Sequence, residues 1–364
     1  MELWVLAAFA AFCAIEFVLE RVLTWLNGRR VAAGGGRVPA VLEGSIPEDV
    51  GRRSAAYSLA RTRFDHTAAV FDLGILLVVL FSGFLPWLKE TLTHLGLSGA
   101  ALGIAFWLAA LWAISLIGLP MSWYETFRLE ARFGFNKTTP KIFLVDLVKG
   151  WVVSAILGAP LLWALFSFIE SAGDSWWLWG AGVIIGFQLL MMVIYPLWIA
   201  PLFNKFTPLA DGSLREKLFA LASKAGFAAK GIFVMDGSRR STHSNAYFTG
   251  FGKSRRIVLY DTLVDQLKED ELAAVLAHEI GHYKKGHVPM MLILSAVMVL
   301  AGFAIADQLL GWRAFYRAFG FSSAWAPAGL FLLAQVAGTF TFWLKPIFNA
   351  LLRRFEYEAD AYAA

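Results

Sequence analysis

Long apolar stretches alternate with polar connections along most of the chain. Seven stretches are long enough, or nearly so, to cross a bilayer as helices of about 20 residues. Tryptophans stand near many of their ends, as aromatic residues do at membrane–water interfaces. The pattern therefore predicts seven membrane-spanning helices, a number that the buried helices of a soluble protein would hardly imitate. The predicted spans are Leu3–Leu23, Ala68–Leu88, Ala100–Leu119, Trp151–Ile169, Trp177–Leu197, Pro289–Leu310 and Ala324–Leu344.

One polar insertion, between the fifth and sixth spans, is large enough to form a small folded unit. It begins with an amphipathic helix, predicted for Ser213–Ala225, and ends with a second helix, predicted for Glu269–Lys285. Three runs rich in β-branched and aromatic residues lie between them and predict strands at Gly231–Met235, Ser244–Phe251 and Arg256–Tyr260. The expected fold class is an all-α polytopic membrane protein with a small α/β cytosolic insertion.

These patterns divide the chain into three parts. Residues 1–204 hold spans one to five with their loops, residues 205–287 form the insertion, and residues 288–364 hold the last two spans and a terminal helix. Asn27–Thr67 and Ser122–Lys149 are polar and are expected to be cytoplasmic loops.

Composition and charge agree with a membrane protein. The chain is 58% hydrophobic and 16% charged, against about 25% charged residues in an ordinary soluble domain. The loops after spans one, three and five and the tail after span seven hold 28 Lys and Arg residues, and the other three loops hold 3. This positive-inside pattern predicts an external amino terminus and a cytoplasmic insertion. It also accounts for the net charge of +5, so a membrane lipid, and not a nucleic acid, is the expected neighbour.

The stretch His278-Glu279-Ile280-Gly281-His282 is the strongest chemical signal in the chain. Two histidines four residues apart project from one face of a helix, so both imidazoles can reach one metal ion. Glu279 would lie beside the open position of the metal, where a carboxylate can take a proton from the attacking water. The alternative is a solvated helix with two surface histidines. Since Cys13 is the single cysteine, the ligands of one zinc ion per chain must be histidines and carboxylates.

A third protein ligand is expected, because catalytic zinc usually takes three and leaves one position open. Glu356 and Asp360 stand four residues apart on one helix face. Glu356 could bind the metal, while Asp360 could accept a hydrogen bond from a ligand histidine. Glu358 is a rival ligand on another face. The other interpretation is an exposed acidic helix end that balances nearby arginines, and spacing alone does not separate the two.

The remaining histidines lack ligand spacing. His287 lies five residues beyond His282 and would face another way on a continuous helix. It is therefore expected to be a membrane-surface residue and not a ligand.

The strand predicted just before the metal helix is a candidate for substrate binding. A peptide could add to it as an extra strand and bring its scissile bond to the metal. The candidate contacts are Asn245, Ala246 and Tyr247, with Asn245 hydrogen-bonded to the substrate backbone. The alternative is that Asn245 is only a turn or strand-edge residue.

Several of these stretches together resemble one family, CAAX prenyl protease 1, a group of integral-membrane zinc metalloproteases. The resemblance is carried by His278–His282, Arg353–Ala363 and the long run Ser244–Asp261. Tyr195–Pro208 and Gly134–Thr138 are also similar to that family, so the match covers nearly the whole chain.

The resemblance implies roles for individual residues. It makes His278, His282 and Glu356 the zinc ligands, Glu279 the catalytic carboxylate, Asp360 the hydrogen-bond partner of a ligand, and Asn245 a contact to substrate backbone. It also implies seven helices around a large water-filled chamber, with the zinc site at its cytosolic side. The family continues beyond the glutamate-bearing helix and supplies a further histidine near the active site. The chain is therefore expected to lack a carboxyl-terminal segment, and its oxyanion stabiliser is unassigned.

The sequence thus predicts a cytosol-facing, membrane-embedded zinc endopeptidase that acts on a peptide or protein substrate. A prenyl group on that substrate is a weaker expectation than hydrolysis itself. The composition is typical of a bacterial inner-membrane protein, and a eukaryotic member would lie in the endoplasmic reticulum. Two rival functions are a membrane quality-control peptidase for unfolded proteins and a transporter or lipid-binding protein with a structural metal. Acidic residues in or beside the spans, Glu16, Asp72 and Asp307, would matter for the last of these.

Overall fold

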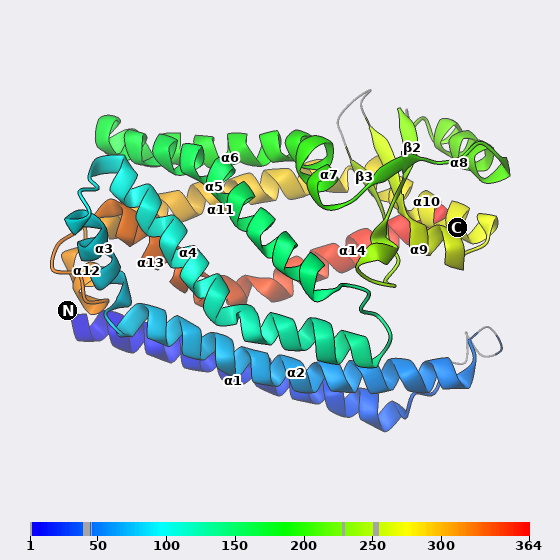
Figure 1. The fold of residues 1–364 in the computed structure, drawn as a ribbon, viewed down its shortest axis with the longest axis horizontal. Helices are drawn as coiled ribbons and strands as arrows, with labels where there is room; N and C mark the ends of the chain where they lie inside the picture. The colour runs from blue at the N-terminus through cyan, green and yellow to red at the C-terminus, as the bar shows by residue number, and fades with distance from the viewer. Residues whose placement is uncertain (1, 39–43, 45, 228–229, 250–254) are drawn as a thin grey trace. The chain divides into compact units, whose positions relative to one another are not determined.

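The computed structural model describes residues 2–38, 44, 46–227, 230–249 and 255–364. The described chain is mostly helical, with one small sheet (Figure 1). It forms two compact units: unit 1 is Met1–Gly134 with Gln308–Trp343, and unit 2 is Phe135–Asp307 with Leu344–Ala364. The predicted three-part division at residues 204 and 287 stays a prediction.

Unit 1 is helical. Its elements are α1 (Glu2–Gly34), α2 (Glu48–Phe81), α3 (Phe84–His94), α4 (Gly99–Tyr124), the π-helix η2 (Glu125–Glu130), α12 (Arg313–Ala318) and α13 (Ala326–Thr341), with the 3-10 turn η7 (Phe342–Leu344) at its end. Aromatic rings fill much of its interior, and Phe106, Tyr316 and Phe331 are almost completely buried there.

Unit 2 carries the sheet. Its membrane-type helices are α5 (Pro140–Ser171), α6 (Trp176–Ile194) and α11 (His287–Leu310). Short elements continue from α5 and α6: η3 (Gly173–Ser175), the π-helix η4 (Tyr195–Ile199) and α7 (Ala200–Phe203). The insertion and the terminal helix contain β1 (Phe206–Pro208), α8 (Ser213–Lys224), β2 (Gly231–Met235), η5 (Gly237–Arg239), β3 (Ala246–Thr249), β4 (Arg256–Tyr260), α9 (Asp261–Gln266), α10 (Glu269–Lys284) and α14 (Lys345–Ala363).

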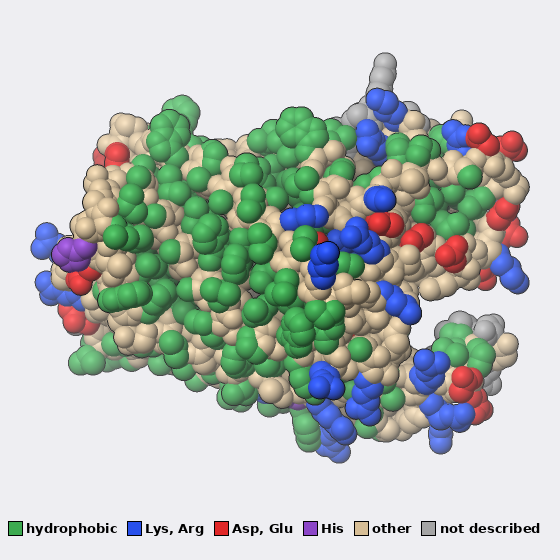
Figure 2. Space-filling view, viewed as in Figure 1, with side chains coloured by type: hydrophobic (Ala, Val, Ile, Leu, Met, Phe, Trp, Pro, Cys, Tyr) green, Lys and Arg blue, Asp and Glu red, His purple; other side chains and the backbone are tan. Residues whose placement is uncertain are grey.

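Within the described residues, seven helical segments are long and apolar enough to cross a membrane, which confirms the predicted number. In unit 2, large apolar side chains on these helices are exposed, with Ile156 at 64%, Trp163 at 59% and Ile293 at 67%. Figure 2 shows such side chains gathered over α5 and α6, whereas acidic side chains gather over the sheet and α8. Exposed apolar surface of this extent requires lipid around it, so the chain is a multi-pass integral membrane protein.

Three predicted boundaries were wrong, and one of them is that of Ser122–Lys149, which was expected to be a loop but contains the end of α4, η2 and the start of α5. The second span was expected to run from Ala68 to Leu88, but α2 ends at Phe81 and α3 begins after Gly83, whose φ of 80° is left-handed. The apolar run continues through this break, so hydropathy alone does not reveal it. The segment Asn27–Thr67, expected to be a loop, instead contains the end of α1 and the start of α2. Its arginines and alanines are good helix formers, and a helix can extend beyond the apolar part of a span.

The sheet has the order β1-β2-β4-β3, with β2 and β4 parallel and the other pairs antiparallel. Two strands were predicted with their observed bounds, Gly231–Met235 and Arg256–Tyr260. The third begins at Ala246 instead of Ser244, and the predicted end at Phe251 lies outside the described residues. The three-residue strand β1 was missed because an alternating pattern is not visible over so short a run.

The inner side of the sheet and α8 form a core against α10. From α10, the side chains Leu272, Leu276 and Ile280 are nearly completely buried in it. These residues recur every four positions and define one face of the helix. His278 and His282 project about 200° away from Leu276 and Ile280 respectively, so packing of the apolar face turns the histidines out of this core.

Candidate active site

The helix α10 is well specified by its local sequence. It spans Glu269–Lys284, one residue short of the predicted end. Its first turn holds three acidic residues, which the positive end of the helix dipole favours. The Glu271 side chain also accepts a hydrogen bond from the backbone N–H of Lys268 at 2.8 Å, which satisfies a donor that the helix itself leaves unpaired.

Close packing of α14 against α10 brings the second part of the site into place. Gly281 and Ala359 are both buried at the crossing of the two helices. A Cβ atom on Gly281 would lie 2.9 Å from the Cα of Ala359 and 3.0 Å from its carbonyl oxygen. The glycine within the motif thus permits an approach that any side chain at residue 281 would prevent.

Three possible ligand atoms converge where these helices meet. The Nε2 atoms of His278 and His282 lie 3.2 Å apart. The carboxylate of Glu356 lies 3.4 Å from Nε2 of His278 and 3.7 Å from Nε2 of His282. One atom from each residue lies within 4.8 Å of the other two. Two imidazole nitrogens and a carboxylate are a donor set that fits zinc and leaves a position open.

The predicted hydrogen-bond partner of a ligand is also present. Asp360 Oδ1 lies 2.8 Å from Nδ1 of His278. An ionised carboxylate can only accept, so Nδ1 of His278 donates, and a neutral ring then presents a lone pair at Nε2. The structure therefore brings all four residues of the two sequence motifs, His278, His282, Glu356 and Asp360, into one cluster.

Glu279 lies beside this cluster. Burial raises the pKa of its carboxyl; His278 acts in the opposite direction, and Glu356 adds to the increase. Burial also lowers the pKa of His282, which favours the neutral ring that metal binding needs.

His287 was expected at the membrane surface, and this was wrong. It is 4% exposed, and its Nδ1 lies 2.9 Å from Nδ1 of His282. The prediction assumed a continuous helix, but α10 ends at Lys284 and Gly286, with φ of 72°, turns the chain before α11 begins. The glycine was the available signal, since Gly just past a helix often marks its end.

The candidate substrate strand lies at the end of the strand order, and within the described residues β3 pairs with β4 alone. Ala246 is buried in the core, so a substrate could meet only its backbone. The side chain of Asn245 accepts a hydrogen bond from the backbone N–H of Ala246 at 2.8 Å. Tyr247 is half-buried; its burial, together with Tyr260 and Tyr195, raises its pKa to about 12, so the phenol keeps its proton. The substrate contacts stay a prediction.

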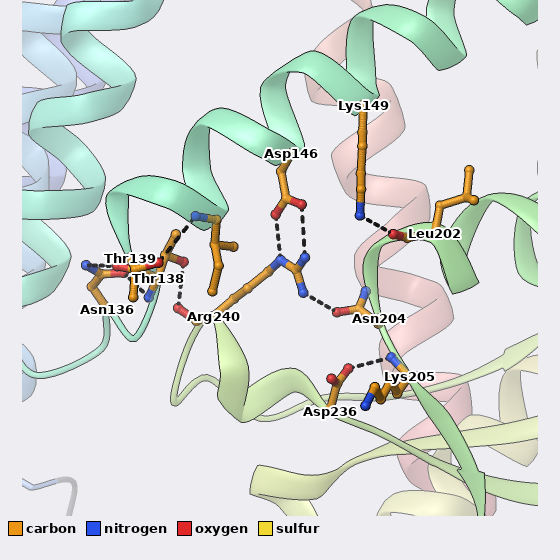
Figure 3. Close-up of polar contacts among 11 residues, drawn as sticks. Asn136, Thr138, Thr139, Asp146, Lys149, Leu202, Asn204, Lys205, Asp236 and Arg240 are labelled. Carbon is orange, nitrogen blue, oxygen red and sulfur yellow. Dashed lines mark hydrogen bonds and ion pairs between the residues drawn. The ribbon is translucent and has the colours of Figure 1, made fainter.

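A polar clamp around Arg240 holds the loop that leads into β3 (Figure 3). Its guanidinium donates two hydrogen bonds to Asp146 of α5, at 2.8 and 3.1 Å, and one to Asn204 after α7, at 2.8 Å. Its carbonyl oxygen accepts from the backbone of Lys137 at 2.9 Å and from Thr138 Oγ1 at 3.1 Å. Sequence reasoning missed this residue. The sequence held one indirect signal. Three of the partners of Arg240, namely Lys137, Thr138 and Asn204, lie in residues 134–138 and 195–208, the two stretches that resemble the family.

We expect Arg240→Lys to raise KM for a peptide substrate while leaving metal content unchanged. Lysine keeps the charge but loses the planar fork that binds a carboxylate through two parallel hydrogen bonds. The loss corresponds to about 1–3 kcal/mol of stability, concentrated in the loop before Asn245. Steady-state kinetics and a thermal unfolding curve measure both effects. Arg239→Lys is the matched control, because Arg239 is exposed; equal effects from the two variants would contradict a role for the clamp.

Seven spans together with a His/His/Glu cluster on two packed helices define a multi-pass membrane metallopeptidase. Two family models match this chain: "CAAX prenyl protease N-terminal, five membrane helices" over residues 29–205, and "Peptidase family M48" over residues 208–364. The chain belongs to the CAAX prenyl protease 1 family within peptidase family M48, and it is a metalloendopeptidase acting on peptide or protein substrates.

Relatives match along almost the whole chain. A CAAX prenyl protease 1 homolog of Arabidopsis thaliana is 38% identical over 97% of this chain and 84% of its own length. CAAX prenyl protease 1 of Saccharomyces cerevisiae is 35% identical over 97% of this chain and 83% of its own. The crystal structure of S. mikatae Ste24p superposes with a TM-score of 0.90 at 33% identity, covering 98% of this chain and 87% of that one. These matches confirm the family that the motifs indicated.

Proposed function

We propose that this chain is a zinc endopeptidase in which His278, His282 and Glu356 hold the metal and Glu279 is the catalytic carboxylate. The observation that carries the proposal is the convergence of the two Nε2 atoms and the Glu356 carboxylate within 4.8 Å. A structural zinc site is usually closed by four protein ligands, whereas this group offers three. That difference supports a catalytic site over a structural one.

The chain's own residues supply positioning and proton transfer. Bound zinc would lower the pKa of a water ligand to about 7 and polarise the scissile carbonyl. Glu279 then accepts a proton from the attacking water on its carboxylate and delivers it to the nitrogen of the leaving amine. The hydrogen bond between Asp360 and Nδ1 of His278 holds that ring in one orientation.

The edge of β3 is proposed to hold the substrate backbone in an extended form. A free strand edge offers backbone N–H and C=O groups to a peptide that adds alongside it, and within the described residues β3 pairs on one side only. Asn245 lies at the start of this edge, where its side-chain amide could reach the substrate backbone. Tyr247 lies two residues further along the same edge.

A prenylated peptide is the proposed substrate class, and the relatives are named for this activity. Each buried methylene of a lipid chain contributes about 0.8 kcal/mol of membrane affinity. A farnesylated substrate is therefore concentrated at the membrane that holds the enzyme. The bias of Lys and Arg toward the loops on one side supports placing the site on the cytoplasmic face.

The test is to purify the protein in detergent, measure bound metals, and assay a farnesylated CAAX peptide beside its unprenylated twin. We expect about one zinc per chain, cleavage that a chelator abolishes and zinc restores, and preference for the farnesylated peptide. Equal cleavage of both peptides would favour a general membrane peptidase and remove the prenyl specificity. A folded protein without stoichiometric zinc would refute the proposed metal.

A further inference from the structure

We propose that His287 and Glu358 are positioning residues that fix the second metal ligand, His282, in its metal-binding tautomer. This inference rests on the proposed metal site, and it assigns a role to two residues outside the metal-binding motif. Sequence reasoning had placed His287 at the membrane surface and treated Glu358 only as a rival ligand.

A continuous chain of polar contacts leads away from His282. Its Nδ1 lies 2.9 Å from Nδ1 of His287, and Nε2 of His287 lies 3.2 Å from Oε2 of Glu358. The other carboxylate oxygen of Glu358 accepts a hydrogen bond from Nε of Arg354 at 2.7 Å. Four side chains thus connect in series, from one end of α10 through the start of α11 to α14.

The carboxylate at the end of the chain orients the series. Glu358 can only accept, so Nε2 of His287 donates to it. With its hydrogen on Nε2, the His287 ring accepts at Nδ1, and Nδ1 of His282 donates to it. Nε2 of His282 is left with a lone pair, and it faces Nε2 of His278 at 3.2 Å, where the metal is proposed to bind.

Packing holds His287 in the required orientation. Its ring stacks on Phe355 with centroids 4.0 Å apart and planes 12° from parallel. The turn at Gly286 brings the residue back beside His282. If this buried ring turned to offer a different nitrogen, it would lose its contacts to His282 and Glu358. The fold therefore fixes the order of the contacts in the series.

The helix α14 therefore supports both ligand histidines in different ways. Asp360 accepts directly from His278, whereas Glu358 acts on His282 through an intervening imidazole. Glu358 lies two residues from both Glu356 and Asp360, on another side of α14, and there it meets the start of α11. This geometry explains why its spacing from the other acidic residues gave no useful signal.

The test compares zinc affinity among variants, with competition against a chelating dye as the readout. His287→Phe keeps an aromatic ring on Phe355 but removes the acceptor, and we expect a 10–100-fold weaker zinc affinity. His287→Asn places an amide oxygen close to the position of Nδ1, and we expect it to recover most of that affinity. Arg353→Gln is the matched control on α14, because Arg353 is an exposed neighbour.

The outcomes separate the inference from the proposed site. Weaker zinc binding by His287→Phe, rescue by His287→Asn, and unchanged unfolding of the metal-free proteins would support the positioning role. Unchanged affinity of His287→Phe, beside loss of binding in His278→Ala, would overturn the inference and leave the metal site intact. Retained binding in His278→Ala would instead overturn the proposed site. If His287→Phe does not fold, Glu358→Leu, which removes the acceptor, decides: an affinity equal to that of the unchanged protein would overturn the inference.

Discussion

Glu279→Gln is expected to retain bound zinc and to lose at least about 10³-fold in kcat, within the range that general acid–base catalysis supplies. Glutamine has nearly the same shape but cannot accept a proton from the attacking water. Glu279 is not one of the three residues whose ligand atoms converge, so its substitution should leave the metal group intact. Turnover of a fluorogenic peptide and the zinc content of the same sample measure the two effects together.

Glu216→Gln provides the matched control for this experiment. Glu216 is exposed on α8, so removal of its charge tests for a general effect of lost negative charge. Its turnover should equal that of the unchanged protein. If Glu279→Gln kept more than a tenth of the original kcat, a different residue would have to be the proton acceptor.

Gly281→Ala is expected to weaken zinc binding at least about tenfold and to destabilise the protein by about 1–3 kcal/mol, as overpacking typically does. The added methyl group would meet the backbone of Ala359, at 2.9 Å from its Cα and 3.0 Å from its oxygen. Backbone atoms cannot turn aside as a flexible side chain can, so α14 must shift away and carry Glu356 with it. The better helix propensity of alanine, about 1 kcal/mol, acts in the opposite direction.

Gly182→Ala is the control, because a Cβ atom at this α6 position would meet nothing within 4 Å. There the substitution should be neutral or slightly stabilising. Zinc titration and thermal unfolding of both variants give the comparison. A Gly281→Ala protein with unchanged zinc affinity would show that the two helices tolerate a wider separation than the site geometry indicates.

Features with a local signature could be predicted from the sequence. The spans follow from runs of apolar residues, and the two correctly bounded strands follow from β-branched residues such as Ile232 and Val258. The histidine pair in α10 and the Glu356–Asp360 pair in α14 each share a helix face at four-residue spacing, so each pair could be recognised separately. The packing of the two helices against each other could be predicted only from the family resemblance.

Features that depend on contacts distant in sequence could not be predicted. Arg240 meets Asp146 across 94 residues, and no periodicity connects them. His287 was misjudged because a single left-handed glycine reverses the chain, which a helical wheel does not represent. The break between α2 and α3 has the same origin, since Gly83 interrupts the helix while the hydropathy continues.

The separation of α10 and α14 in the chain has a consequence for biosynthesis. His278 and Asp360 are 82 residues apart, and Asp360 lies near the end of the seventh candidate membrane span, Ala326–Ala363. At a translation rate of about 5–20 residues per second, roughly 4–16 s pass between synthesis of the two residues. For most of that interval the nascent chain carries its histidine pair without Glu356, the third of the proposed metal ligands. On the proposed metal site, the peptidase would therefore become active only after most of its last candidate membrane span has been made.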